Sequence, residues 1–427
     1  METEVAALSS SERPRAVRWK TFLMFLAVVG PGIITANVDN DAGGITTYSL
    51  AGAVYGTKLL WTLLPITVAL IVVQEMSARM GAATGKGLAD LIRENFGVKI
   101  TFYLMLALLI TGFGNTISEF AGVAASMELF GVSKLVAIPV SALVIWLLVL
   151  KGTSRVVERV FLVACLFYLV YPLSSYLAHP RWAPVLRDTL LPSGLRFDSG
   201  YIGMLIGIVG TTIAPWMQFY LQSSVVEKGI RKDRYWISRW DVIVGCITTD
   251  LVAFFIIAAC AVTLNVHHVS IHDAADAARA LEPLAGRYAS LLFAFGLLNA
   301  SLFSAAILPL ATVYYVCEAF GWEAGIDKKW SEAKGFYGMY SAILILGAGI
   351  VLWPNFPLIG VMFVSQVVNG ILLPFVLIFV LLLINRTDLM GDQVNGPIFN
   401  VIAWTTSAVM ILLTLALVAT SLGLRLG

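Results

Sequence analysis

Two aspartates and two asparagines lie inside the first strongly apolar stretch of the chain, Gly30-Pro-Gly-Ile-Ile-Thr-Ala-Asn-Val-Asp-Asn-Asp-Ala-Gly-Gly44. Acidic side chains at this depth in an apolar segment predict an ion site. Asp39 and Asp41 would point to roughly opposite sides of a continuous α-helix, whereas on an extended backbone they would share one side. Because the glycines disfavour a continuous helix, we expect an interrupted helix with an acidic site at its break.

A later apolar run repeats this pattern at Gly207-Ile-Val-Gly-Thr-Thr-Ile-Ala-Pro215. Pro215 removes a backbone donor and clashes with the preceding turn, so this helix should also break. Two interrupted segments in corresponding positions are typical of a secondary transporter built as an inverted repeat, with its site near the middle of the membrane.

The composition agrees with a membrane location for these segments. The 427-residue chain is 59% hydrophobic and 13% charged, with a mean hydropathy of +0.86, which is too apolar for a soluble protein of this size. The net charge of +2 does not indicate a nucleic-acid partner. Four cysteines without CxxC spacing are expected to be packing residues, without a disulfide framework. We therefore predict an all-α polytopic membrane protein embedded in the lipid bilayer.

Eleven apolar runs are long enough to span a bilayer, which takes about 20 residues. They cover 21–55, 58–83, 98–130, 134–151, 155–178, 199–226, 236–265, 286–321, 334–353, 358–385 and 397–424. The interrupted runs open two halves of five, which predicts a first repeat at 21–178, an external loop at 179–198, a second repeat at 199–385, and a loop with an eleventh helix at 386–427.

The N-terminal residues 1–20 are polar and basic, and no small-residue cleavage site follows them, so we expect a cytoplasmic tail. Most lysines and arginines fall in the loops on the same side as this tail. The positive-inside rule then places the N-terminus in the cytoplasm and the C-terminus outside, in a multi-pass protein of the cell membrane.

The residues around the first break resemble the first helix of the Nramp divalent-metal transporters. The shared residues there are Gly30-Pro-Gly32, Asp41-Ala-Gly-Gly44, Ala51-Gly-Ala53, Gly56 and Lys58-Leu-Leu-Trp61. The similarity continues at Thr84-Gly-Lys86, Leu88-Ala89, Arg93-Glu94, Glu119, Ser365-Gln-Val367, Leu373-Pro-Phe375 and Leu389-Met-Gly391. This resemblance runs through both halves. It implies a LeuT-like inverted repeat of 5+5 transmembrane helices with helices 1 and 6 broken, and transport of divalent cations by alternating access.

Two motifs depart from the family pattern. Nramp proteins carry Asp-Pro-Gly-Asn in helix one and Met-Pro-His in helix six, whereas this chain has Asp41-Ala-Gly-Gly44 and Ala214-Pro-Trp216. The lost methionine is a soft thioether that suits transition metals, and the lost asparagine is an oxygen donor whose replacement by Gly44 is expected to widen the cavity. Such a site resembles that of the Nramp-related magnesium transporters.

The resemblance implies a metal site formed by Asp41, Gly44, Thr211, Ala214 and Gln366. Carbonyls freed at the second break and the Gln366 amide are expected to hold the ion directly or through its waters. Mg²⁺ takes oxygen ligands and keeps several waters while touching one or two carboxylates, so a roomy acidic site without sulfur suits Mg²⁺, and Mn²⁺ is similar enough to follow. Either ion is a transported substrate, and no cofactor is expected. For Asp41, a purely structural cap on the half-helix is the alternative.

Asp39, Thr116, Glu119 and Trp216 are candidates for the cavity or the ion pathway. Asp39 either adds to the negative electrostatic field at the cavity or is merely favoured at its position by the dipole of the second half-helix. Trp216 stands where the family has a histidine linked with proton movement, and Thr116 replaces an aspartate, so proton coupling is not expected. The four histidines fall in predicted external loops. Other acids in or near the spans are expected to line cavities or join polar networks: Glu75, Glu128, Asp250 and Glu318.

Three alternatives stay open. The first is proton-coupled Mn²⁺ or Fe²⁺ transport of the ordinary Nramp type, with Met217 restoring a thioether ligand in a shifted register. The second is a Na⁺-coupled carrier of an organic solute, which the two acids and the lack of an obvious carboxylate-binding pocket disfavour. The third is a sensor or scaffold, which we would expect to carry a large soluble domain. No P-loop or hydrolase motif is present, so an enzyme is not expected. The sequence does not specify the oligomeric state.

Overall fold

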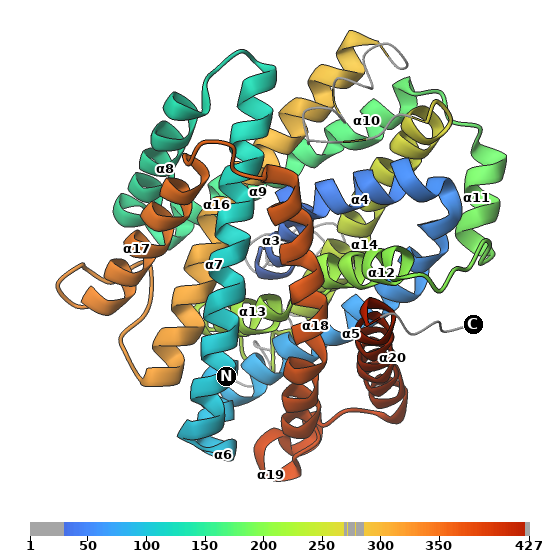
Figure 1. Ribbon diagram of the computed structural model, residues 1–427. Coiled ribbons are helices and arrows are strands. Elements are labelled where there is room, and N and C mark those ends of the chain that lie inside the picture. Colours follow the sequence, from blue (N-terminus) through green and yellow to red (C-terminus); the bar gives the residue numbers. More distant parts are fainter. Residues whose placement is uncertain (1–29, 269–270, 272–277, 279–285, 423–427) are drawn as a thin grey trace, which may run out of the picture.

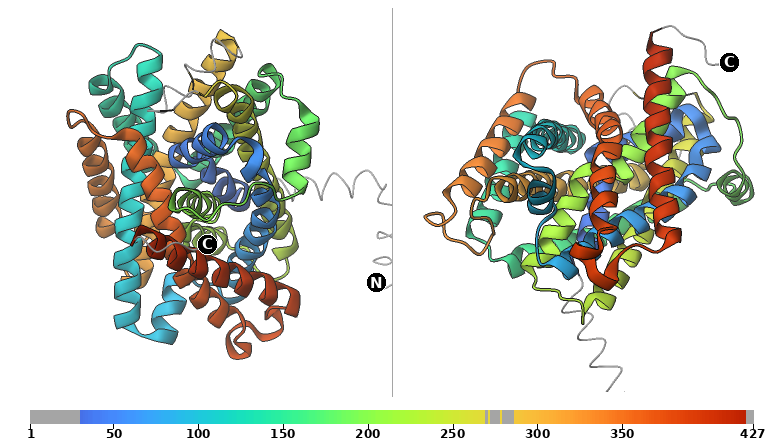
Figure 2. Two further views of the ribbon diagram at one scale, coloured as in Figure 1. Left: turned by 45° about the vertical axis from the view of Figure 1, so that its right-hand side comes forward. Right: turned by 90° about the horizontal axis from the view of Figure 1, so that it is seen from below.

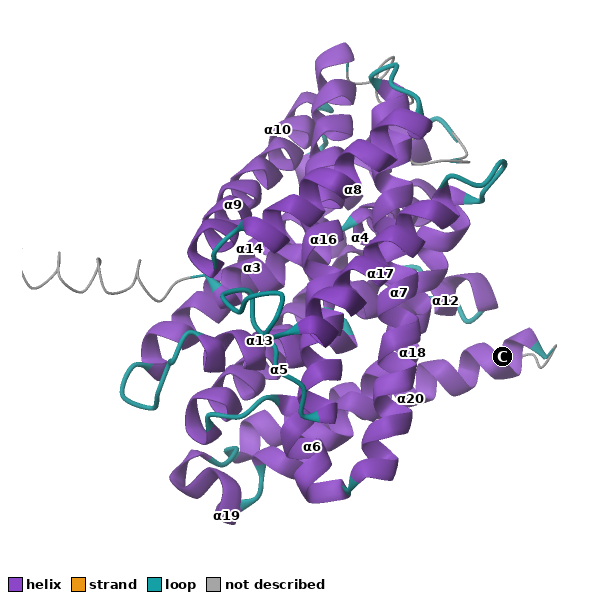
Figure 3. Cartoon of the chain, turned by 90° about the vertical axis from the view of Figure 1, so that its left-hand side faces the viewer, coloured by secondary structure: helices purple, strands orange, loops and turns teal. Residues whose placement is uncertain are grey.

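The computed structural model describes residues 30–268, 271, 278 and 286–422, and every regular element in them is helical (Figures 1 and 3). Within these residues, ten stretches are long and apolar enough to cross a membrane. They are Ala42–Thr84, Val98–Leu129, Lys134–Lys151, Ser154–Leu177, Ser199–Glu227, Lys232–Asn265, Arg287–Phe320, Lys334–Val351, Gly360–Ile384 and Pro397–Ser421. The all-α, multi-pass prediction is confirmed.

The first expected span is divided into short elements. Helix α3 (Pro31–Asn37) is followed by a 3₁₀ turn, η1 (Val38–Asn40), and then by helix α4 (Ala42–Tyr55). Gly56, at φ 61°, ends α4, and the 3₁₀ segment η2 (Gly56–Thr62) leads into α5 (Leu63–Thr84). Helices α4 and α5 therefore form one continuous apolar stretch, which explains ten stretches where eleven were expected. The predicted tail at 1–20 lies outside the described residues.

The second break lies where the sequence predicted it. Helix α12 (Ser199–Thr212) ends before Ile213, and α13 (Pro215–Glu227) begins with Pro215. Between them, Ala214 has an extended backbone at φ −69° and ψ 141°. Proline is well placed at the first position of a helix, because its missing N–H would have had no intrahelical partner there.

The remaining elements surround these two broken helices. They are α6 (Leu88–Phe96), α7 (Val98–Leu129), α8 (Lys134–Lys151), α9 (Ser154–Leu166), η3 (Phe167–Leu169), α10 (Val170–Leu177), α11 (Trp182–Leu190), α14 (Tyr235–Cys260), the π turn η4 (Ala261–Asn265), α16 (Arg287–Phe320), α17 (Lys334–Val351), α18 (Leu358–Ile384), α19 (Thr387–Met390), η5 (Gly391–Gln393) and α20 (Pro397–Ser421). The predicted loop 179–198 thus contains α11. The division into two five-helix repeats stays a prediction.

The broken helices form the centre of the bundle. In Figure 1, α3 and α13 lie behind and between α7 and α18, while α4 and α12 extend to the right of α18. The apolar part of the span Ser199–Glu227 is 89% buried, whereas that of α20 is 17% buried. Helix α20 packs on α18 at the edge of the bundle (Figure 2). The eleventh predicted segment, which corresponds to α20, is therefore peripheral.

Glycines allow the broken helices to approach their neighbours closely. A Cβ atom at Gly32 of α3 would lie 2.6 Å from the backbone nitrogen of Val242 on α14. A Cβ atom at Gly210 of α12 would lie 2.1 Å from the carbonyl oxygen of Gln366 on α18. Backbone therefore packs on backbone at both contacts, which fixes the two breaks against α14 and α18.

Candidate metal site

Asp41 caps the half-helix α4 at the first break. Its backbone is extended, at φ −72° and ψ −178°, and its Oδ1 accepts a hydrogen bond of 2.5 Å from the N–H of Gly44. A carboxylate is favoured here by the free N–H groups and by the helix dipole. The Asp41 side chain is buried, with 4% of the residue exposed. Capping and ion contact are thus compatible roles for Asp41, because Oδ1 accepts the capping hydrogen bond while Oδ2 is not used by the cap.

A chain of side-chain amides connects Asp41 to α7. The Nε2 of Gln366 lies 3.3 Å from both carboxylate oxygens of Asp41, while its Oε1 accepts a bond of 3.0 Å from Asn369. Asn369 in turn exchanges hydrogen bonds with Asn115 at 3.1 and 3.3 Å. In this conformation Gln366 therefore supports the carboxylate as a donor. No sequence pattern indicated Asn115 or Asn369 as site residues, although an asparagine three residues after Gln366 shares its helix face.

Glu119 on α7 reaches the same half-helix. Its Oε2 accepts a hydrogen bond of 3.1 Å from the N–H of Ala42, and its side chain contacts that of Asp41. Glu119 is fully buried, and its Oε1 has no hydrogen-bond partner among the described residues. The structure therefore places two carboxylates together at the N-terminus of α4.

The second break contributes hydroxyl and carbonyl oxygens. Thr211 Oγ1 donates a hydrogen bond of 3.1 Å to the carbonyl oxygen of Asp39, which joins the two breaks. The Thr211 carbonyl precedes Pro215 by four residues, and proline has no N–H to satisfy it. The Ala214 carbonyl accepts from the N–H of Met217 at 3.2 Å and so belongs to the first turn of α13.

Gly44 lies in a crowded position. A Cβ atom there would lie 2.2 Å from the Asp39 carbonyl oxygen and 2.7 Å from Thr211 Oγ1. At the preceding Gly43, a Cβ atom would lie 2.1 Å from Gln366 Nε2. The expectation that glycine widens the cavity is wrong for this conformation: glycine allows the two breaks to touch, and the site is closed.

Asp39 has different surroundings from Asp41. Its strongest electrostatic neighbour is Asp250 on α14, and the adjacent Asn40 donates to Thr249 on the same helix. The expected extended backbone is found only at Asp41, because residues 38–40 form a 3₁₀ turn. The prediction that an extended break would place Asp39 and Asp41 on one side is therefore wrong about the backbone.

The two candidates that replace family ionisable residues are buried in packing positions. Thr116 Oγ1 donates to the Gly112 carbonyl at 2.9 Å, and its methyl group faces Gly347 on α17. Trp216 packs against Tyr220, with ring centroids 6.2 Å apart. The three described histidines, at 179, 267 and 268, lie outside the ten apolar stretches, and His272 lies outside the described residues.

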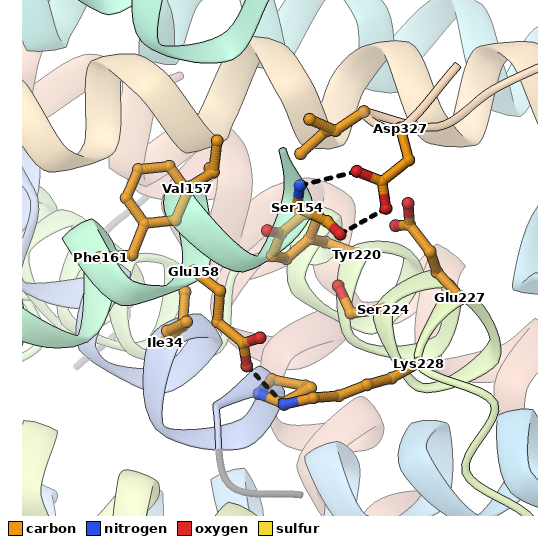
Figure 4. Close-up of a pocket in the computed structure, with 12 residues that line it drawn as sticks. Ile34, Ser154, Val157, Glu158, Phe161, Tyr220, Ser224, Glu227, Lys228 and Asp327 are labelled. Carbon is orange, nitrogen blue, oxygen red and sulfur yellow. Dashed lines mark hydrogen bonds and ion pairs between the residues drawn. The ribbon is translucent and has the colours of Figure 1, made fainter. Parts of the chain in front are cut away.

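A cavity of about 130 Å³ lies beside α3, α9 and α13, and Figure 4 shows charged groups along it. Glu158 on α9 pairs with Lys228, directly after α13. The N–H and Oγ of Ser154 donate to Asp327 at 2.9 and 2.5 Å, and these bonds lower the pKa of the Asp327 carboxyl below its ordinary value. These contacts hold α9 to α13 and to the α16–α17 connection. They join segments far apart in the chain, so sequence patterns gave no signal for them.

The comparisons with known proteins agree with this architecture. A family model described as Nramp, natural resistance-associated macrophage protein-like, matches residues 32–420. The divalent metal cation transporter MntH of Klebsiella pneumoniae is 27% identical over 97% of both chains.

Solved structures are similar over most of the chain. A manganese transporter of Eremococcus coleocola has a TM-score of 0.78 at 22% identity, covering 97% of this chain and 89% of that one. MhsT, solved with L-phenylalanine, has a TM-score of 0.53 at 14% identity, covering 93% and 97%. The LeuT-like fold is confirmed by these similarities.

Proposed function

The chain belongs to the Nramp family, and from this premise we propose that it carries divalent metal cations across the membrane, with Mg²⁺ preferred, Mn²⁺ accepted and no proton coupling. The relatives named as divalent metal cation and manganese transporters support the class of substrate. The N-terminus faces the cytoplasm and the C-terminus the outside in this proposal, as the distribution of basic loops predicts.

The proposal depends above all on the groups that surround the Asp41 carboxylate. They are the Glu119 carboxylate, the Gln366 amide and the backbone of Gly44. Thr211 adds a hydroxyl and a carbonyl from the second break. Every one of these side chains offers oxygen or nitrogen, and none offers sulfur. Mg²⁺ takes oxygen ligands and typically contacts one or two carboxylates, so this set suits it. The closed site opens to admit the ion when the breaks separate.

Two features support transport without proton coupling. The position of the family histidine holds Trp216, which has no titratable group. Mg²⁺ is also drawn inward by a negative membrane potential, worth about 2.3 kcal/mol per charge per 100 mV and roughly twice that for a divalent ion. A proton gradient is then not needed to drive Mg²⁺ into the cell.

The second candidate is proton-coupled Mn²⁺ transport, and the names of the relatives favour its substrate. In that mechanism Glu119, with one oxygen unpartnered beside Asp41, would carry the proton. The two functions differ in what moves with the metal ion, so they can be separated by measuring pH together with uptake.

The test is uptake into liposomes that contain the purified protein, a trapped Mg²⁺ indicator and a trapped pH dye. We expect Mg²⁺ entry that Mn²⁺ inhibits and Ca²⁺ inhibits weakly, because Ca²⁺ prefers six to eight longer oxygen contacts. The pH dye should change no more than in empty liposomes. Equal flux of Ca²⁺ and Mg²⁺ would contradict the substrate assignment. A Mg²⁺-dependent, ionophore-sensitive acidification that Glu119→Gln removes would show proton coupling instead.

A further inference from the structure

Asp39 and Asp250 are two buried carboxylates that lie on either side of the contact between η1 and α14. Asp39 is 2% exposed and Asp250 5% exposed. Neither carboxylate of Asp39 and Asp250 receives a well-formed hydrogen bond from the described residues; the Thr67 hydroxyl lies close to Asp250, but it donates to the Leu63 carbonyl at 2.7 Å. The strongest electrostatic neighbour of Asp39 is Asp250, followed by Asp41, so its charged surroundings are anionic. Two such groups in an apolar bundle are costly unless something else compensates them.

The residues next to this pair are joined by hydrogen bonds from η1 to α14. Asn40 follows Asp39 and donates its Nδ2 to Thr249 Oγ1 at 2.7 Å and to the Thr249 carbonyl at 3.1 Å. Thr249 directly precedes Asp250. The remaining atom of the Asn40 amide, Oδ1, is fully buried and also has no partner among the described residues. A fifth unpartnered oxygen therefore lies where the two acidic segments meet.

Asp241, on the same helix as Asp250, is a buried carboxylate whose charge is compensated by backbone N–H groups without an ion. Asp241, nine residues before Asp250, accepts hydrogen bonds from the N–H groups of Gly30, Gly32 and Ile33 at 3.2, 2.7 and 3.2 Å. These donors belong to the N-terminal turn of α3, where the helix dipole also favours the negative charge. Asp250 has no equivalent donors, although both acids belong to α14.

We propose that Asp39 and Asp250 bind a second metal cation, at a site separate from the ligands of Asp41. The available atoms are two carboxylates and an amide oxygen, which is the donor set of a hard cation such as Mg²⁺, Mn²⁺ or Na⁺. The described part of the chain has no group of three or more His, Cys, Asp or Glu side chains that could hold a metal ion, so a cation held by these two carboxylates would need water for its remaining ligands. A cation here neutralises the pair and holds η1 against α14. Its binding does not depend on the proposed transport function.

The experiment measures equilibrium binding of radioactive Mn²⁺ and, separately, Na⁺ to the purified full-length protein in detergent. Asp41→Ala removes the first site, so the remaining binding reports the second. We expect Asp41→Ala to keep saturable binding of about one cation per chain for at least one probe. Adding Asp250→Asn should lower that binding at least tenfold, because one of the two anionic ligands is lost. Asp39→Asn should have the same effect in the same background.

A matched control is Cys260→Ala, which changes a buried neutral residue on the same helix, ten residues after Asp250. It should leave the binding of Asp41→Ala unchanged. Thermal unfolding provides a second measurement that also verifies folding: the bound probe should raise the midpoint of Asp41→Ala but not of Asp41→Ala with Asp250→Asn. In chelator without sodium, the double variant should be at least as stable as Asp41→Ala, because it removes like-charge repulsion.

The proposal is overturned if Asp41→Ala binds neither probe, or if it binds them equally with and without Asp250→Asn. A failure of the proposed transport function gives a different result. In that case liposome uptake is absent, while binding to Asp41→Ala and its loss with Asp250→Asn are unaffected.

Discussion

The two aspartates of the first break differ in what surrounds them, although they are two residues apart. Asp41 receives the N–H of Gly44 and the amide of Gln366, and it stands at the N-terminus of α4. Asp39 lies in the preceding 3₁₀ turn, has Asp250 as its strongest charged neighbour, and receives no hydrogen bond at its carboxylate from the described residues. The same side chain is thus a compensated charge in one place and an uncompensated charge in the other.

This difference separates two ways to use a buried carboxylate. Donors around Asp41 stabilise its charge when no ion is bound, so an ion can leave the site without leaving a bare anion behind. The Asp39 and Asp250 pair lacks such donors, so losing a bound cation would restore the full repulsion. We therefore expect exchange at Asp41 and more persistent occupancy at Asp39.

The largest effect is expected from removing the two charges one at a time. Asp41→Ala should lower Mg²⁺ uptake into liposomes by at least about 100-fold, because a charge contact near 4 Å is worth about 4 kcal/mol even at an effective dielectric of about 20. Asp39→Asn should lower uptake by less than about tenfold, since its charge acts on the transported ion from farther away. Comparable losses in both variants would show that the two acids form one site.

A smaller effect should come from filling the space where the breaks touch. Gly44→Ala places a methyl group 2.2 Å from the Asp39 carbonyl oxygen, so it should push the two breaks apart. We expect a loss of stability of about 1 to 3 kcal/mol, as for other overpacked positions, and several-fold slower uptake. Thermal unfolding and liposome uptake would measure these changes.

The control for this change is Gly114→Ala on α7, where an added Cβ atom meets no atom within 4 Å. It should change neither the unfolding midpoint nor the uptake rate appreciably. If Gly44→Ala behaves like Gly114→Ala, the closed contact between the two breaks is unimportant for transport.

The smallest effect is expected at an acid exposed to water. The two bonds from Ser154 lower the pKa of Asp327, so the stability that they add is present above the ordinary aspartate pKa of about 3.9. That stability is lost only as the pH falls through the lowered pKa. Between pH 5 and 8 this contact should therefore add no pH dependence to uptake.

Ser154→Ala tests the same contact, and it should change the uptake rate by less than about twofold, because exposed charged contacts contribute little. A rate that falls with Ser154→Ala as strongly as with Gly44→Ala would give this surface contact a role in transport. Uptake measured from pH 5 to 8 in both the original chain and Ser154→Ala would decide this.

The sequence predicted the helices and both breaks because these depend on local properties. The apolar run at 134–151, for example, agrees with α8 residue by residue, since length and hydropathy define a membrane span. Pro215 stops α12 through its own covalent structure, in any surroundings. Asp41 was recognisable because a carboxylate next to glycines in an apolar run is costly without a role.

The sequence alone therefore determined the membrane class, the spans, the breaks and the presence of acidic groups at the first break. Only the tertiary structure decided which groups surround each acid, because the Gln366 amide and the Glu119 carboxylate come from α18 and α7, far from Asp41 in the chain. It also decided that Gly44 lets the two breaks touch and that Asp250 is the strongest charged neighbour of Asp39. The physical reason is that charge compensation and packing depend on distances between separate helices, which local hydropathy and backbone preference do not fix.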